Sequence, residues 1–172
     1  MKILVFSDSH GHSAPMRAAI EAHKDAEAVV FLGDGAAEAW DILGDHPTLA
    51  RCILSGNCDS RLALAARGAD TSEECVLDFG GKRFFCLHGH TRDVKWGMDR
   101  ALYRASEVQA DVILFGHTHI ALNEYAPDPA DPARKILLFN PGSVGKSLRH
   151  TYGVIHVING AISAGHGQAP ER

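Results

Sequence analysis

The chain has 172 residues, of which 45% are hydrophobic and 22% are charged, as in an ordinary globular domain with a single core. Its 17 Lys and Arg residues against 21 Asp and Glu residues give a formal net charge of -4, which argues against duplex nucleic acid as a partner. The apolar stretch Ile3–Phe6 is too short for a signal-peptide core or a membrane span. We therefore expect a cytoplasmic protein that does not associate with membranes.

The four cysteines are widely spaced and include no CxxC pair. This spacing indicates neither a disulfide framework nor a zinc site made of cysteine ligands. We expect reduced, mostly buried thiols at Cys52, Cys58, Cys75 and Cys86.

The first third of the chain alternates short apolar runs with helix-like segments, the pattern that opens an α/β fold. The first helix is expected to have Ser13 as its N-cap and a proline in its first turn. The predicted strands are Lys2–Phe6, Ala28–Leu32 and Arg51–Leu54, and the predicted helices are Pro15–Ala22 and Ala36–Leu43.

The middle of the chain predicts a hairpin, a helix and another strand. Gly80-Gly81 is a turn signal between the runs Glu74–Phe79 and Lys82–Leu87. Apolar residues near helical spacing then predict a helix over Gly97–Gln109, followed by the strand Val112–Phe115.

The last third predicts strands, with a proline-rich surface loop at 127–132. Together these patterns predict an α/β sandwich of mixed sheets, with residues 1–164 forming one domain and residues 165–172 a loose tail. The expected strands are Ile120–Tyr125, Lys135–Phe139, Tyr152–Ile158 and Ala161–Ala164.

Polar side chains follow most of the predicted strands, where the strands of an α/β sheet end at a common edge. Carboxylates, imidazoles and one amide suit Mn²⁺, Fe²⁺, Zn²⁺, Co²⁺ or Ni²⁺ better than an all-oxygen Mg²⁺ or Ca²⁺ site. The candidate metal ligands are Asp8, His10, Asp34, Asn57, His88, His117 and His119.

Each of these residues also has a structural interpretation, which for Asp8, His10, His117 and His119 is an ordinary polar residue that makes a turn and hydrogen bonds at a strand end. Asp34 could cap the following helix, Asn57 could occupy a left-handed turn, and His88 could be a hydrogen-bonded core histidine. Cys58 could be a small packed residue. A turn explains Asn140–Ser143 as well as substrate contact does, and we treat this motif as structural.

Five ordered motifs and a final turn motif make the metal interpretation specific. The sequence resembles the calcineurin-like metallophosphoesterases, in particular the small YfcE-type phosphodiesterases of bacteria and archaea. This resemblance implies a four-layer αββα sandwich of two mixed sheets flanked by helices. The motifs are Asp8-Ser9-His10-Gly11, Gly33-Asp34, Gly56-Asn57-Cys58-Asp59, His88-Gly89-His90, Gly116-His117-Thr118-His119 and Asn140-Pro141-Gly142-Ser143.

The resemblance also implies two divalent transition-metal ions, with Mn²⁺ the first candidate. Asp34 would be shared between them, and a hydroxide bridging the ions would attack the phosphoester in line. The implied ligands are Asp8, His10, Asp34 and His119 for one ion, and Asp34, Asn57, His88 and His117 for the other.

One position departs from the larger relatives, which have a histidine directly after the motif asparagine. Here that residue is Cys58, and a thiol is a poor general acid for an alkoxide leaving group. We therefore expect either a preference for good leaving groups or a proton from another residue, with His90, His12 and Asp59 as candidates.

The expected activity is hydrolysis of small phosphodiesters or phosphomonoesters. A nuclease is the alternative enzyme, although the chain has no positively charged excess. A metal-binding scaffold with weak or no catalysis is the non-enzymatic alternative, because a eukaryotic retromer subunit has a similar fold. The sequence is compatible with a homo-oligomer.

Overall fold

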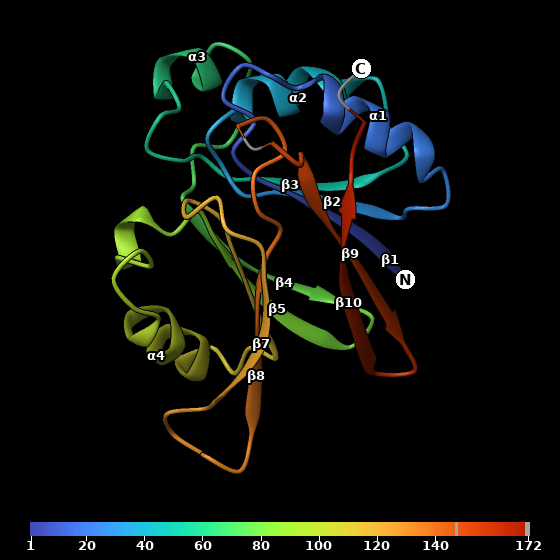
Figure 1. The fold of residues 1–172 in the computed structure, drawn as a ribbon. Coiled ribbons are helices and arrows are strands. Elements are labelled where there is room, and N and C mark those ends of the chain that lie inside the picture. The colour runs from blue at the N-terminus through green and yellow to red at the C-terminus, as the bar shows by residue number, and fades with distance from the viewer. Residues whose placement is uncertain (147, 171–172) are drawn as a thin grey trace.

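A computed structural model describes residues 1–146 and 148–170 of the chain (Figure 1). Ten strands, four α-helices and one short 3₁₀-helix make up the described part. In chain order they are β1 (Lys2–Phe6), α1 (Ala14–Ala22), β2 (Ala28–Phe31), α2 (Ala36–Gly44), β3 (Ala50–Ile53), α3 (Arg61–Ala65), β4 (Glu74–Phe79), β5 (Lys82–Leu87), η1 (His90–Arg92), α4 (Asp99–Glu107), β6 (Val112–Phe115), β7 (Leu122–Pro127), β8 (Lys135–Asn140), β9 (Thr151–Ile158) and β10 (Ala161–Gln168).

The strands form two mixed sheets of five strands each. The first has the order β10-β9-β1-β2-β3, with β1, β2 and β3 parallel and β9 antiparallel to β1. The second has the order β4-β5-β6-β8-β7, with β5, β6 and β8 parallel and the two outer strands antiparallel to their neighbours. The carboxyl ends of the parallel strands therefore lie at one edge of each sheet.

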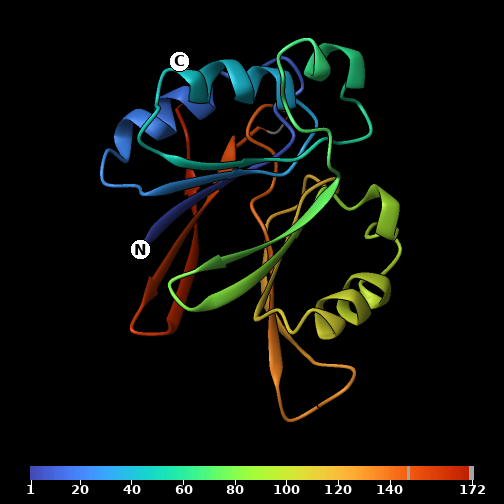
Figure 2. The same cartoon turned by 180° about the vertical axis from the view of Figure 1, so that it is seen from behind.

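The sheets pack face to face, and helices cover their outer faces (Figures 1 and 2). In β1, Ile3 and Val5 face the core between the sheets, whereas Leu4 and Phe6 pack with residues of α1 and α2. Helix α4 covers the outer face of the second sheet. Both faces of the central strands are buried, which is why these strands appear in the sequence as continuous apolar runs. The predicted mixed sandwich with flanking helices is confirmed.

Most predicted elements agree with the structure to within one or two residues at each end. Helix α3 was not predicted, although Ser60 accepts a hydrogen bond from the N–H of Ala63 as an N-cap does. Ser13 occupies the N-cap position of α1, but its side chain makes no capping hydrogen bond.

The predicted loose tail is wrong for residues 165–168, which belong to β10 and pair with β9 as far as Gln168 opposite Thr151. Its two glycines obscured the strand pattern in the sequence. His166 stabilises this segment because its ring stacks on Phe139 at 4.7 Å and its Nε2 donates a hydrogen bond to the carbonyl of Asn140. The prediction for residues 171–172 lies outside the described residues.

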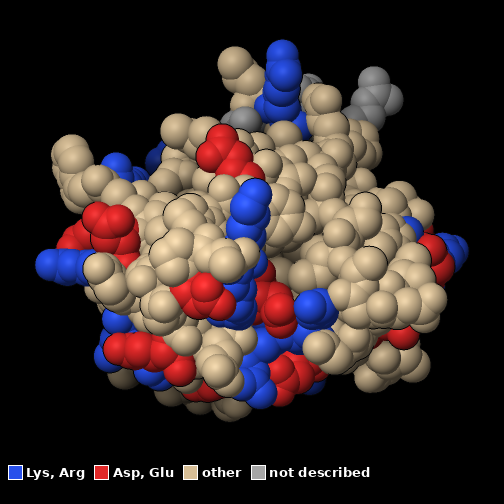
Figure 3. All heavy atoms as spheres, turned by 90° about the horizontal axis from the view of Figure 1, so that it is seen from below, with Lys and Arg blue, Asp and Glu red and all other residues tan. Residues whose placement is uncertain are grey.

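Charges of both signs are interspersed on the surface seen in Figure 3, in keeping with a net charge of -4. Among the described residues, no helix has the length and apolar character needed to cross a bilayer.

Two isoleucines of β9 test the core between the sheets. Ile155 is fully buried there and Ile158 is 60% exposed. Ile155→Ala is expected to lower the free energy of unfolding by about 2–5 kcal/mol, because it leaves a cavity between the sheets. Ile158→Ala is expected to change it by less than about 0.5 kcal/mol. Urea denaturation of both variants measures the difference, and equal effects would contradict the described packing.

Candidate metal centre

The candidate ligands come from loops of both sheets and converge at one edge of the sandwich. Strands β1, β2 and β3 of the first sheet lead into four of them, and β5 and β6 of the second sheet lead into three. From the first sheet come Asp8, His10, Asp34 and Asn57, and from the second His88, His117 and His119.

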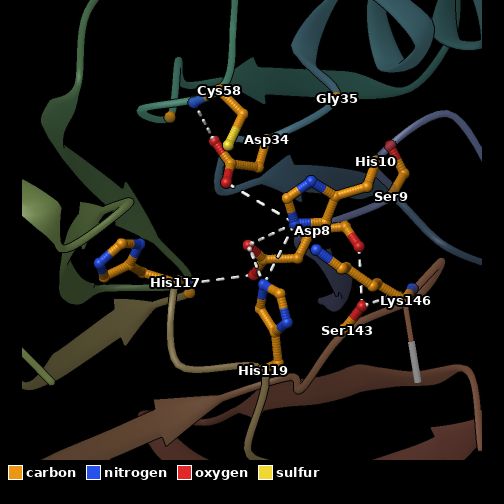
Figure 4. Close-up of polar contacts among 12 residues, drawn as sticks. Asp8, Ser9, His10, Asp34, Gly35, Cys58, His117, His119, Ser143 and Lys146 are labelled. Atoms are coloured by element: carbon orange, nitrogen blue, oxygen red, sulfur yellow. Dashed lines mark hydrogen bonds and ion pairs between the residues drawn. The ribbon is translucent and has the colours of Figure 1, made fainter.

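One group of donors consists of Asp8, His10 and His119 (Figure 4). The Nε2 atoms of the two histidines are 3.1 Å apart. Oδ1 of Asp8 lies 3.2 Å from Nε2 of His119 and 3.7 Å from Nε2 of His10. Three potential ligand atoms thus face one small volume.

A second group consists of Asp34, His88 and His117, and a third, made of His10, Asp34 and Cys58, overlaps the other two. Oδ2 of Asp34 lies 3.5 Å from Nε2 of His88, and that nitrogen lies 3.2 Å from Oδ1 of Asn57. Oδ2 of Asp34 is also 3.7 Å from Nε2 of His10, which belongs to the first group. Asp34 therefore lies between the two groups.

The environment of His88 fixes which of its nitrogens faces the cluster. The ring is fully buried, and Nδ1 lies 2.7 Å from the carbonyl oxygen of Leu32. A carbonyl only accepts, so Nδ1 carries the proton and donates. In the neutral ring, Nε2 is left with a lone pair directed at Asp34 and Asn57, as a metal ligand requires.

The pKa shifts in the second group favour an ionised Asp34 and a neutral His117, whereas burial lowers the pKa of His88 and its contacts with the carboxylates of Asp34 and Asp8 raise it more. Burial raises the pKa of Asp34, but the ring of His88, when it is also protonated at Nε2, and the backbone N–H of Cys58 donate to the carboxylate and lower it more, so the net shift is downward. Burial lowers the pKa of His117 to about 4, and the positive charge of protonated His88 adds to this shift. An anionic carboxylate and a neutral imidazole are the forms that bind a cation.

The donors fit a bound cation better than an internal hydrogen-bond network. Oδ1 of Asp8 is buried and has no hydrogen-bond partner among the described residues, although a buried carboxylate oxygen without a partner is costly. The facing Nε2 atoms of His10 and His119, 3.1 Å apart, can hydrogen-bond to each other only when one of them carries a proton and the other does not. The mixture of carboxylate and imidazole donors matches divalent transition metals.

The backbone at the cluster is strained. Five of the candidate ligands are in the left-handed region, with φ values of 58° for Asp8, 45° for His10, 58° for Asp34, 67° for His117 and 60° for His119. Such a conformation costs a non-glycine residue on the order of 1 kcal/mol or more and persists where the surrounding structure holds it, commonly at functional sites.

A close backbone approach explains one glycine of the motifs. A Cβ on Gly56 would lie 2.2 Å from Oδ1 of Asp34 and 2.6 Å from the backbone nitrogen of Asp34. Any side chain at this position would displace the Asp34 carboxylate from between the two donor groups.

Asp59 is bound by backbone groups rather than facing the cluster. Oδ1 accepts hydrogen bonds from the N–H groups of Gly35 and Ala36 at 2.8 and 2.9 Å. Oδ2 accepts from those of Asp34 and Gly56, both at 2.8 Å. Both oxygens of the Asp59 carboxylate therefore accept from backbone N–H groups, four in all.

Asp59 instead acts as the cap of α2. The capping role considered as an alternative for Asp34 is not seen, because Gly35 occupies the N-cap position and makes no side-chain cap. The carboxylate of Asp59 satisfies the exposed N–H groups at this helix end, where a negative charge is favoured. It thereby joins the loop after β2 to the loop after β3.

The remaining proton-donor candidates lie around the cluster. Cys58 is exposed as a whole residue. The partial burial of its thiol and the nearby charge of Asp34 both raise the pKa of that thiol. The ring of His90 lies 5.4 Å from that of His88, and its Nε2 is 3.6 Å from Glu73. His12 is exposed and stacks on His150.

The end of β8 and the β8–β9 loop support the ligand loops, in keeping with the structural interpretation of Asn140–Ser143. Ser143 donates a hydrogen bond to the backbone carbonyl of Asp8 at 2.8 Å, and Asn140 donates to that of Gly116 at 3.0 Å. The Asn140–Ser143 motif is thus structural and supports ligand loops of both sheets. Lys146 extends toward the cluster in Figure 4, and no periodicity or motif in the sequence indicated its position.

Comparison with known proteins identifies the class. A family model described as the calcineurin-like phosphoesterase superfamily domain matches residues 1–160. The chain belongs to the calcineurin-like phosphoesterase superfamily. It is a metal-dependent phosphoesterase, a hydrolase of phosphoester bonds, which confirms the expectation from the motifs.

Relatives support this assignment along most of the chain. It is 32% identical over 146 residues to the probable metallophosphoesterase YsnB of Bacillus subtilis, covering 84% of this chain and 75% of that protein. It is 30% identical over 154 residues to a phosphodiesterase of Methanocaldococcus jannaschii, covering 83% of each. A solved Streptococcus pneumoniae structure described as a predicted phosphoesterase has a TM-score of 0.75 at 22% identity, covering 97% of this chain and 88% of that one, and so shares the fold.

Replacing the Asp59 carboxylate tests its role as a cap. Asp59→Asn is expected to lower the free energy of unfolding by at least about 2 kcal/mol, because an amide cannot accept from four N–H donors. Its metal affinity is expected to fall by about 10–100-fold through the displaced loops. Urea denaturation and calorimetric Mn²⁺ titration measure the two effects.

The matched control is Asp78→Asn, since Asp78 is 64% exposed and pairs with Arg83 on the surface. It is expected to cost less than about 1 kcal/mol. A loss of turnover by Asp59→Asn with stability and metal affinity unchanged would show instead that Asp59 transfers a proton.

Proposed function

We propose that this protein hydrolyses small phosphodiesters, using two divalent transition-metal ions held between its two sheets. The observation that carries the proposal is the pair of donor groups, Asp8 with His10 and His119, and Asp34 with His88 and His117. Asn57 adds an amide oxygen beside His88, and Asp34 lies between the groups as a shared ligand should. Mn²⁺ is the first candidate metal, and Ni²⁺, Fe²⁺, Zn²⁺ and Co²⁺ suit the same donors.

Bound divalent ions would supply Lewis acidity toward the phosphoryl oxygens and lower the pKa of a water nucleophile. The residues of the chain would bind and orient these ions. The two carboxylates Asp8 and Asp34 provide the negative charge that holds the cations. The buried Nδ1–H of His88 is fixed on Leu32, which keeps the opposite nitrogen directed into the site.

Two of the loops that carry candidate ligands are short, and these two favour a compact substrate. Only residues 32–35 separate β2 from α2, and only residues 116–121 separate β6 from β7. Such short loops leave little surface with which to grip a macromolecule. The net charge of -4 also disfavours duplex nucleic acid, so we place the nuclease alternative second.

Adding metals back to stripped protein tests the proposal. Hydrolysis of bis-p-nitrophenyl phosphate is expected to return with Mn²⁺ or Ni²⁺ more than with Mg²⁺, and to exceed hydrolysis of p-nitrophenyl phosphate. Asp34→Asn is expected to reduce the diester rate at least about 100-fold, because a shared ligand is lost. Metal content is measured in parallel by mass spectrometry.

Asp45→Asn serves as the control, since Asp45 is 63% exposed and pairs with Arg17. It is expected to keep the activity of the unmodified protein. Two bound metals without hydrolysis of either ester would contradict the proposal and favour the scaffold alternative.

Leaving-group dependence tests the role of Cys58. Its thiol has a raised pKa, and its backbone N–H donates to Oδ1 of Asp34 at 2.7 Å, so replacement leaves that contact available. Cys58→His is expected to raise kcat/KM for diesters with alkyl leaving groups by about 10²-fold, since an imidazolium can protonate an alkoxide. The p-nitrophenyl diester is expected to change little. Equal rates for both proteins on both substrates would mean that another group supplies the proton.

A further inference from the structure

Three of the four cysteines lie together between the sheets and belong to none of the donor groups of the candidate metal centre. Cys52 is in β3, Cys75 in β4 and Cys86 in β5. Sγ of Cys52 is 3.2 Å from Sγ of Cys75, although 23 positions separate the two residues in the chain. Cys86 faces Cys75 directly across the β4–β5 pair and is fully buried.

The position of the close pair in the fold is specific. Strand β3 is the edge strand of the first sheet, and β4 is the edge strand of the second. Cys52 and Cys75 therefore face each other from the two layers of the sandwich. A shift of about 1 Å would bring their sulfurs to the bonding distance of about 2 Å.

The pair is accessible to small molecules, whereas Cys86 is not. Both residues are partly exposed and border a surface cavity of about 320 Å³ that is also lined by Trp40, Arg51 and Asp70. Hydrogen bonds from the thiols of Cys52 and Cys86 lower the pKa of Cys75, against the opposing effect of burial. Cys75 is thus the better nucleophile of the pair.

We propose that Cys52 and Cys75 are a site of reversible disulfide formation, oxidised by hydroperoxides, which cross-links the two sheets. The Cys75 thiolate attacks one peroxide oxygen and breaks the O–O bond, giving a sulfenic acid and hydroxide. The sulfur of Cys52 then forms the S–S bond and expels the sulfenic hydroxyl group as water. Two thiols and one hydrogen peroxide molecule give one disulfide and two waters, and a dithiol reductant reverses the reaction.

The cross-link would act on segments that support ligands of both sheets. Beyond Cys52, the N–H of Ser55 donates to the carbonyl of Ser72 at 2.8 Å. Just before Cys75, the carbonyl of Glu73 accepts from the N–H of His88 at 3.1 Å. A bond between β3 and β4 restrains the sheets against each other, and with them the separation of the two ligand sets. The cross-link rests on the thiol geometry alone and does not depend on the proposed phosphodiesterase activity.

Mass spectrometry of the full chain tests the proposal directly. Reduced protein is treated with hydrogen peroxide, free thiols are blocked, and a non-reducing tryptic digest is analysed. The expected product links the peptide 52–61 to the peptide 68–82, and thiol titration falls from four groups to two. Peptide 52–61 also contains Cys58, so the digest is repeated in Cys58→Ser protein.

Thermal unfolding gives a second readout. The oxidised protein is expected to melt on the order of 5–10 °C higher than the reduced protein, and a dithiol should remove the increase. Cys75→Ser is expected to abolish both the linked peptide and the increase, whereas Cys86→Ala should keep both. Either of two results overturns the proposal. One is a link from Cys75 to Cys86. The other is four free thiols after a hydrogen peroxide treatment that does oxidise a peroxide-sensitive control protein. Fragmentation of the linked peptide from the unmodified chain distinguishes Cys52 from Cys58, so a variant that fails to fold does not obscure the answer.

Discussion

The face-to-face packing of the two sheets is the constraint on which the rest of the structure depends. Neither sheet holds a complete donor group. Asp8 and His10 come from the first sheet and meet His119 from the second, while Asp34 and Asn57 meet His88 and His117. The apolar core between the sheets, with Phe84 and Ile155 fully buried, therefore sets the distance between ligands. Burial that stabilises the fold also positions the site.

Hydrogen bonds hold the ligand loops in the positions that the packing of the sheets sets. The Asp59 carboxylate gathers four N–H groups from two ligand loops, and the Asn140–Ser143 turn supports the loops that follow β1 and β6. These contacts hold five ligands in left-handed backbone conformations that they would not adopt alone. A bound cation would further offset the repulsion between the carboxylates of Asp8 and Asp34. Backbone strain, charged side chains and close packing are thus all found at the edge of the sandwich that carries the candidate ligands.

Much of the fold could be predicted because its central strands are buried on both faces and appear as apolar runs, as in Val112–Phe115. The exceptions have local causes. Helix α3 has five residues, too few for a periodic pattern, and glycines interrupt β10. The metal centre could be anticipated because its donors follow strand ends, where an α/β fold brings them together. The role of Asp59 could not, since its four partners are backbone groups that carry no sequence signal.

The sequence by itself determined the strand and helix order, the types of donor atom and their places after the strands. Only the tertiary structure decided how closely the donors of each group approach one another and that the Asp59 carboxylate caps α2. It also brought Cys52 to Cys75 across the two sheets, where the sequence had indicated separate, reduced thiols. The physical reason is the same in each case. Each of these contacts joins residues that are distant in the chain, and its geometry depends on the register and stacking of the two sheets. Local periodicity in the sequence indicates only which face of one helix or strand is buried.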